Sequence, residues 1–270
     1  MPAALIWFLV VGVGLCVGSF LNVCIHRLPA GRSIVAPRSA CPGCGAPIAW
    51  HDNVPLLSYG LLLGRCRRCR APIGWRYPAV EGATGLLFAL LFLDRGPSVA
   101  FLDGALLGAL LVALIVIDAL HQILPDRLTL PGVAAGLLLS PLRAAPHPVR
   151  DALIGATLGY LLPFAINAAY RGLQAARRVP AAAREDGIGM GDFKLLAMIG
   201  AFLGPRLLLF TVFVGSVAGA TAGIWLILRR GYGWKSRLPF GVFLGGAALL
   251  ALFAGDAWIA WYLGRAGFAP

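Results

Sequence analysis

Long stretches of this sequence contain no charged residue, and that feature limits the possible folds more than any other. The first stretch, Ala3 to Ile25, has 23 residues and no charge, and about 20 apolar residues suffice to cross the hydrocarbon core of a bilayer. The whole chain is 59% hydrophobic and 13% charged, whereas a soluble domain is about 45–50% apolar and about 25% charged. The sequence therefore predicts an integral membrane protein.

Seven further apolar segments follow the first one. They cover residues 78–93, 98–118, 128–142, 151–170, 193–204, 206–228 and 239–263. We expect an all-α polytopic membrane protein with about eight transmembrane helices, in which the short segment 193–204 is a tilted or half-spanning piece. The expected organisation is a first transmembrane helix (1–25), a polar insertion (26–77) and a transmembrane helical core (78–270).

The positive charges are distributed unevenly along the chain, whose formal net charge is +12. If all eight segments span, the loops on one side hold 17 Lys and Arg residues and those on the other side hold 5. Cytoplasmic loops carry the excess of Lys and Arg, so the first side is predicted to be cytoplasmic. Nucleic-acid binding, the other usual reason for a basic balance, is not expected, because these residues sit in short loops between apolar runs. The expected partner is the lipid bilayer.

Four cysteines form two pairs in the polar insertion. Cys41-Pro-Gly-Cys44 and Cys66-Arg-Arg-Cys69 are separated by 21 residues, close to the spacing of a four-thiolate zinc site. Zinc would stabilise a loop that is too small for its own hydrophobic core. Four thiolates close the coordination shell, so this zinc would be structural. The alternative, redox-active pairs or a disulfide clip, is disfavoured by the expected cytoplasmic location.

Two of the acidic residues lie at the edges of apolar segments. Asp118 ends the run GALLGALLVALIVID, and Asp192 follows a turn with glycine at 187, 189 and 191. A carboxylate at such a position is costly and typical of a functional site. The predicted topology places both on the cytoplasmic side, where two carboxylates that share one proton would activate water, as in an aspartyl protease. The alternative for Asp192 is a helix N-cap after a glycine loop.

Other acidic residues have structural explanations. Asp126 follows Leu124-Pro125 and is better placed to cap or orient the next helix than to catalyse. Asp186 precedes the glycine turn and would face a substrate or simply belong to the loop. None of the four histidines lies in a serine- or cysteine-hydrolase context or in an HExxH motif.

Several motifs occur together and in a characteristic order over roughly residues 11–245. They are Gly14-Leu-Cys-Val-Gly18-Ser-Phe-Leu-Asn22-Val with Arg27-Leu-Pro29, the CxxC pairs followed by Arg76-Tyr-Pro-Ala-Val-Glu81, Ile117-Asp118 with Leu124-Pro125-Asp126, and Gly189-Met-Gly-Asp192-Phe-Lys194. In these motifs the chain resembles the prepilin peptidases, the type IV leader peptidases. The resemblance implies an aspartyl protease of the bacterial inner membrane with Asp118 and Asp192 as its catalytic pair. Such an enzyme cuts the basic leader from type IV prepilins or type II secretion pseudopilins after a glycine, at the cytoplasmic face.

The resemblance also implies a second activity. Many members with the four-Cys insertion N-methylate the new N-terminal residue with S-adenosylmethionine, and Glu81 to Gly85 falls where the family's methylation function has been placed. Asp186 stands where the family often carries Glu, which shortens its reach. Residues expected to bind substrate or shape the site are Gly189, Gly191, Lys194, Asp126, Asp186 and Glu81. The alternatives are a membrane thiol oxidoreductase that uses the CxxC pairs, and a non-enzymatic transporter or assembly scaffold.

Overall fold

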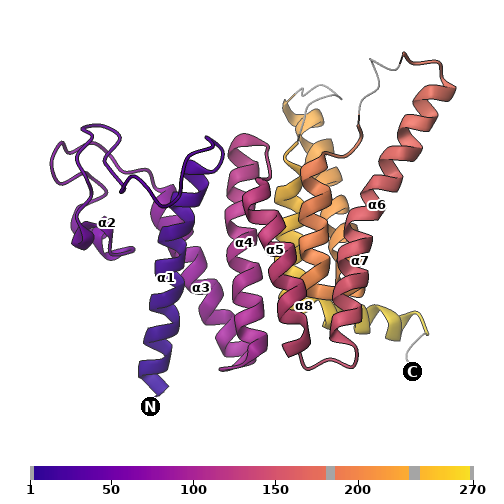
Figure 1. The fold of residues 1–270 in the computed structure, drawn as a ribbon, viewed down its shortest axis with the longest axis horizontal. Coiled ribbons are helices and arrows are strands. Elements are labelled where there is room, and N and C mark those ends of the chain that lie inside the picture. Colours follow the sequence, from indigo (N-terminus) through magenta and orange to yellow (C-terminus); the bar gives the residue numbers. More distant parts are fainter. Residues whose placement is uncertain (1–2, 181–185, 231–237, 268–270) are drawn as a thin grey trace. The chain divides into compact units, whose positions relative to one another are not determined.

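Helices form the regular structure of this chain, and no β-strand occurs among the residues that the computed structural model describes, 3–180, 186–230 and 238–267. The predicted all-helical fold is confirmed. In chain order the helices are α1 (Ala3–Arg27), η1 (Trp50–Asn53), α2 (Leu57–Leu61), α3 (Arg76–Arg95), α4 (Val99–His121), α5 (Asp126–Leu139), η2 (Ser140–Leu142), α6 (Pro148–Ala176), α7 (Met190–Arg230) and α8 (Phe240–Arg265) (Figure 1).

Six helices of the described residues are long and apolar enough to cross a membrane, namely α1, α3, α4, α6, α7 and α8. All eight predicted segments fall in helices, so the difference in number comes from how three of them are built. The segment 128–142 forms α5 and the short turn η2. The 14 residues of α5 extend about 21 Å, less than the hydrocarbon thickness of about 30 Å. The segments 193–204 and 206–228 form the two arms of α7.

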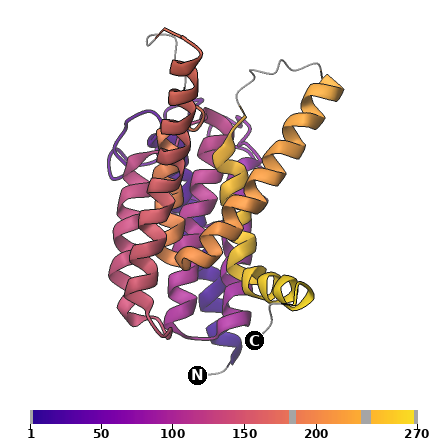
Figure 2. The same ribbon diagram turned by 90° about the vertical axis from the view of Figure 1, so that its right-hand side faces the viewer.

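A break at Gly204 separates the two arms of α7. Gly204 has φ 73° and ψ 177°, a backbone conformation that glycine adopts at no steric cost. Pro205 follows and lacks the N–H that a continuous helix would need at this point. Figure 2 shows the arms diverging from the break, so that both ends of α7 lie on the side where α6 ends and α8 begins. The break thus returns the chain to the side on which α7 started.

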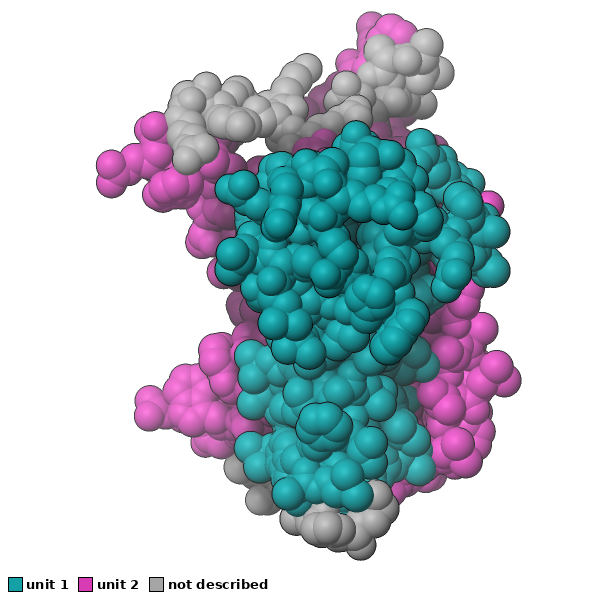
Figure 3. Space-filling model, turned by 90° about the vertical axis from the view of Figure 1, so that its left-hand side faces the viewer, with its two compact units in different colours: residues 1–113 teal, residues 114–270 magenta. Residues whose placement is uncertain are grey.

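The chain divides into two compact units, Met1–Ala113 and Leu114–Pro270 (Figure 3). In the first unit α1 packs along α3, and Asn22 Nδ2 of α1 donates a hydrogen bond to Tyr77 O of α3 at 3.0 Å. The polar insertion lies wholly in this unit. Glu81 of α3 anchors it, because its Oε2 accepts a hydrogen bond from the N–H of Leu56 at 2.9 Å.

In the second unit the first arm of α7 packs against α6 through glycine. A Cβ on Gly159 of α6 would collide with Leu196 O of α7, and Gly155 and Gly200 face each other with equally close backbones. Small residues spaced by four let membrane helices approach this closely. Leu195, which adjoins this contact, is fully buried. The glycines therefore fix the position of α7 on α6.

Replacing Gly159 by alanine tests this contact. The added methyl group meets a backbone carbonyl that cannot move aside, and we expect overpacking to destabilise the protein by about 1–3 kcal/mol. Gly172→Ala is the matched control, since Gly172 lies on the same helix with open space around it. Thermal unfolding of the purified protein in detergent should show a lower Tm for Gly159→Ala only. Equal Tm values in the two variants would contradict the close packing.

Candidate functional site

Asp118 lies in the last turn of α4 and is 5% exposed. Its Oδ2 accepts a hydrogen bond from the backbone N–H of Val242 at 3.0 Å. Val242 is the third residue of α8, and the first N–H groups of a helix have no partner within the helix. The carboxylate of Asp118 therefore caps α8 from a different helix, at the end where the helix dipole favours negative charge.

Asp192 lies in the first turn of α7 and is half-buried. Its N–H donates to Gly189 O at 3.0 Å, which forms the turn that starts the helix. A Cβ on Gly189 would lie 3.4 Å from Asp192 Oδ2, so the carboxylate folds back over the glycine turn. The helix begins at Met190, so Asp192 is its third residue and not the N-cap residue of the alternative prediction.

The second unit brings Asp118 and Asp192 to one place, although 74 residues separate them in the sequence. A Cβ on Gly241 would lie 2.9 Å from Asp118 Oδ2, which places the carboxylate of Asp118 against the first turn of α8. Leu124 lies between the two segments, because a Cβ on Gly191 would be 3.0 Å from Leu124 Cβ and one on Gly241 would be 3.2 Å from Leu124 Cδ1. The last turn of α4 and the first turns of α7 and α8 therefore form a single site.

An ion pair joins the start of α5 to the start of α7. Lys194 Nζ lies 2.6 Å and 2.7 Å from the two carboxylate oxygens of Asp126. Pro125 is the N-cap residue of α5 and Asp126 is the first residue of the helix, so of the two structural roles expected for Asp126, orientation rather than capping fits the geometry. Lys194 lies two residues after Asp192, and the pair ties that turn of α7 to the segment that follows Asp118.

The glycine turn before Asp192 is held by a side chain that the sequence analysis did not single out. Asn167 of α6 accepts a hydrogen bond from Ile188 N–H through Oδ1 at 2.9 Å, and its Nδ2 donates to Ile188 O at 2.8 Å. Asn167 is 7% exposed and is the only buried residue between 164 and 176. The amide side chain of Asn167 stands out in the apolar segment 151–170 and could have been recognised from the sequence, because a buried polar group needs a partner.

Asp186, at the beginning of the same turn, forms an ion pair with Arg171 of α6. Arg171 Nε and Nη2 donate to its two carboxylate oxygens at 2.6 Å and 2.7 Å. Arg171 lies four residues after Asn167 and therefore on the same face of α6. The two side chains together clamp the turn that leads into Asp192.

The four cysteines of the insertion form a cluster. Their Sγ atoms all lie within 4.8 Å of one another, so these residues could hold a metal ion. The backbone N–H groups of Cys69 and Arg68 lower the pKa of the Cys66 thiol to about 6. At Cys69 the backbone N–H of Ala71 acts in the same direction, but hydrogen bonds with the other cysteines outweigh it and raise the pKa to about 11, so Cys66 is the thiol most readily available as a thiolate. The donor set therefore fits a soft or borderline metal ion.

The cysteine cluster is built from two copies of one turn. Residues 41–50 and 66–75 share the pattern Cys-x-x-Cys-x-Ala-Pro-Ile-x-Trp, a repeat that the sequence analysis missed. Cys41 N–H donates to Ala46 O at 2.9 Å, and Cys66 N–H donates to Ala71 O at the same distance. Arg67 of the second copy donates side-chain hydrogen bonds to Asp52, two residues after the first copy, and these bonds hold the pKa of that carboxyl below its usual value.

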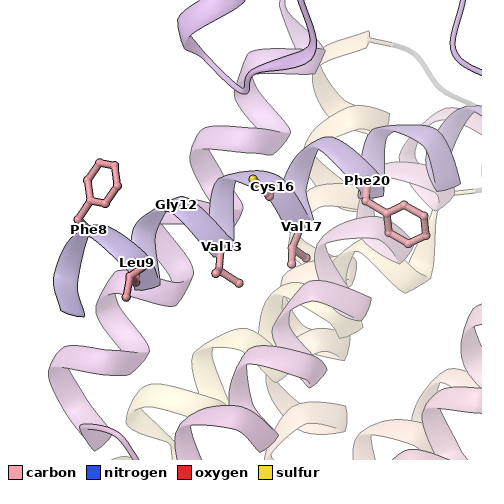
Figure 4. A pocket seen from close by; sticks show the side chains of 7 residues that line it. All are labelled: Phe8, Leu9, Gly12, Val13, Cys16, Val17 and Phe20. Atoms are coloured by element: carbon pink, nitrogen blue, oxygen red, sulfur yellow. The ribbon is translucent and has the colours of Figure 1, made fainter. Parts of the chain in front are cut away.

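A shallow hollow of about 490 Å³ lies along α1. Its lining residues all come from this one helix, as Figure 4 shows: Phe8, Leu9, Gly12, Val13, Cys16, Val17 and Phe20. A hollow on one face of a single apolar helix offers no group for chemistry. We interpret it as part of the surface that membrane lipid covers.

The fold and the site define a polytopic helical membrane protein with two carboxylates at adjoining helix ends and a separate cysteine cluster. The chain matches the Bacterial Peptidase A24 N-terminal domain over residues 13–95 and the Type IV leader peptidase family over residues 105–224. The chain therefore belongs to the type IV leader peptidase family. The predicted family and the prediction of an enzyme are both confirmed, which leaves the thiol oxidoreductase and the non-enzymatic transporter or scaffold without support.

Curated relatives agree with this assignment. The chain is 40% identical to the prepilin leader peptidase/N-methyltransferase of Aeromonas hydrophila, over 92% of this chain and 91% of the relative. It is 37% identical to the protein of that name from Pseudomonas aeruginosa, over 95% and 93%. The corresponding Myxococcus xanthus protein is 45% identical over 81% of this chain and 62% of the relative. No solved structure matches the chain.

The clamp on the glycine turn predicts a specific change in hydrogen exchange. Asn167→Leu removes both hydrogen bonds to Ile188. We expect the backbone amide of Ile188 to exchange about ten- to a hundredfold faster in this variant, because a buried N–H loses its partner. Asn167→Asp is the control, because it keeps the oxygen that accepts from Ile188 N–H. Mass spectrometry of peptides that cover residues 186–190 measures both. Unchanged exchange in Asn167→Leu would show that Asn167 does not hold the turn.

Proposed function

We propose that this protein cleaves the leader peptide from type IV prepilins or type II secretion pseudopilins, after a glycine. The observation that carries the proposal is the convergence of Asp118 and Asp192 at the adjoining ends of α4, α7 and α8. Membership of the type IV leader peptidase family and the names of the relatives support it. The excess of positive charge in the loops on the same side supports a location in the bacterial inner membrane, with the site facing the cytoplasm.

The two carboxylates would have different roles in hydrolysis. Two carboxylates in a confined site share one proton. The N–H of Val242 and the α8 dipole stabilise negative charge on Asp118, so we assign the proton to Asp192. Asp118 takes a proton from a water molecule while Asp192 polarises the scissile carbonyl. The water oxygen forms the new C–O bond while Asp192 gives its proton to the carbonyl oxygen, which yields a gem-diol. Asp118 then gives its proton to the amide nitrogen as the C–N bond breaks, and a hydroxyl of the gem-diol returns a proton to Asp192.

The residues around the pair would position it rather than react. Asn167 and Arg171 hold the turn before Asp192, and the Lys194–Asp126 pair holds the turn after it. A misplacement of about 1 Å costs roughly a hundredfold in rate, so these contacts would matter for catalysis through the position of Asp192. Gly189 and Gly191 leave the backbone beside Asp192 open to an extended substrate.

The cysteine cluster would bind structural zinc. The Sγ atoms of Cys41, Cys44, Cys66 and Cys69 lie within 4.8 Å of one another, and four thiolates would close the shell of one zinc ion. Such an ion offers no open position for water, so its contribution is to hold the two repeated turns together.

The second activity in the relatives' names is methyl transfer, and its donor would be S-adenosylmethionine. When bound, this donor supplies an activated methyl group to the new N-terminal amine. Two buried polar atoms of the first unit have no partner among the described residues, Asn22 Oδ1 and Arg76 Nε. Asn22 Oδ1 would accept a hydrogen bond from an ammonium group, and Arg76 Nε would donate one to a carboxylate. Glu81 would shape this region, since its carboxylate is bonded to Leu56.

The catalytic assignment is tested by conservative substitution. Asp118→Asn and Asp192→Asn should each lower the rate of prepilin cleavage about 10²- to 10⁴-fold, because each removes a group that transfers a proton. The double variant should be little worse than either single one, since the pair acts as a unit. Asp256→Asn, an exposed acid of the same unit, is the control. Full activity in either single variant would end the assignment.

The metal assignment is tested by elemental analysis of the purified protein. We expect about one zinc ion per chain and loss of it in Cys41→Ser, because three thiolates leave the shell open. Cys16→Ser, which lies in α1 outside the cluster, should keep its zinc. Equal zinc content in both variants, or none in the unaltered protein, would refute a four-cysteine zinc site.

A further inference from the structure

A run of large apolar side chains is exposed on the first unit, outside the helices that span the membrane. Leu57, Leu61 and Leu63 are 59%, 74% and 84% exposed. Leu57 and Leu61 lie one turn apart in α2 and share a face. Exposed apolar clusters of this kind mark surfaces that bind a partner or a membrane.

The position at which α2 is attached to α3 indicates that the exposed leucines bind a membrane and not a protein partner. Leu56, which precedes α2, is hydrogen-bonded to Glu81, the sixth residue of α3. At 1.5 Å per residue Glu81 lies about 7.5 Å along α3 from Arg76. Glu81 therefore lies inside a helix that is long enough to span the membrane, so the bond attaches Leu56 to a point within that span and not to its end. In Figure 1 α2 is drawn below the level at which α1 ends.

The segment is held at this depth by internal bonds. Ser58 is 7% exposed, and its Oγ donates to His51 O at 2.8 Å and accepts from Val54 N–H at 3.1 Å. The leucines beside Ser58 therefore point outward from an ordered segment and cannot turn in without breaking these contacts.

The charges that follow the leucines are those that an anionic leaflet attracts. Arg65, Arg68 and Arg70 are exposed, and no ion pair joins them to any described acidic residue. Basic residues next to inserted leucines are typical of segments that lie in a membrane interface. Trp75, at the start of α3, is 77% exposed and belongs to the type of residue that is enriched at this level.

We propose that Leu57–Leu63 is an interfacial segment of the cysteine insertion, immersed in the bilayer where α1 ends and α3 begins. Its leucines contact lipid acyl chains, and the arginines after it lie among anionic headgroups. Glu81 acts as the anchor that sets the depth. The insertion is then attached to the membrane surface at a third point, in addition to α1 and α3.

Spin labels on the full chain in lipid nanodiscs test the proposal. A ketone-bearing amino acid at position 61 or 63 carries the label, which leaves every native cysteine in place. Val35, 87% exposed in the same insertion, is the matched control. Collisions with oxygen report contact with lipid, and collisions with a water-soluble nickel chelate report contact with water.

We expect the oxygen-to-nickel collision ratio to shift toward oxygen at positions 61 and 63 relative to position 35. The shift should be larger in nanodiscs that contain phosphatidylglycerol than in phosphatidylcholine alone. A ratio at 61 and 63 equal to that at 35 would place the segment in water. Few collisions with either reagent would mean that protein covers it. Either result overturns the proposal, and neither bears on peptidase activity.

Discussion

The bond between Asp118 and the first turn of α8 is the interaction on which the rest of the second unit depends. A carboxylate at the end of an apolar helix needs a hydrogen-bond donor, and a charged donor would add a second buried charge. The uncharged N–H of Val242 donates to Asp118 at 3.0 Å and avoids that cost. The same bond satisfies one of the amides that a helix start leaves unpaired. It also fixes where α8 begins relative to α4, and Leu124 fills the space that remains beside Gly191 and Gly241.

Asp192 is positioned next to Asp118 by a different set of contacts. Close contact between Gly159 and the backbone of α7 sets the position of the first arm, and the break at Gly204 sends the second arm back to the side where α8 starts. Asn167 then holds the turn from which Asp192 emerges. Asp192 is therefore positioned mostly by backbone contacts and uncharged amides, as expected where charges are costly to bury.

Much of this arrangement could be predicted from the sequence, because hydrophobicity and charge bias act locally. The apolar runs gave the helices, and the edge positions of Asp118 and Asp192 gave the candidate pair. Contacts between distant residues could not be predicted in the same way. No local pattern shows that Asn167 bonds Ile188, that Lys194 bonds Asp126, or that α5 stops at 14 residues. The repeat of the cysteine turns was readable from residues 41–50 and 66–75 and was overlooked.

The central claim is that Asp118 and Asp192 act together on one water molecule. A structure of the protein with a leader peptide in which a hydroxyl-bearing, non-cleavable group replaces the scissile bond tests it most directly, since such a group imitates the tetrahedral intermediate. The account predicts that this hydroxyl lies within about 2.5–3.2 Å of a carboxyl oxygen of both residues. A hydroxyl that contacts only one of them, with the other turned away from the peptide, would contradict it.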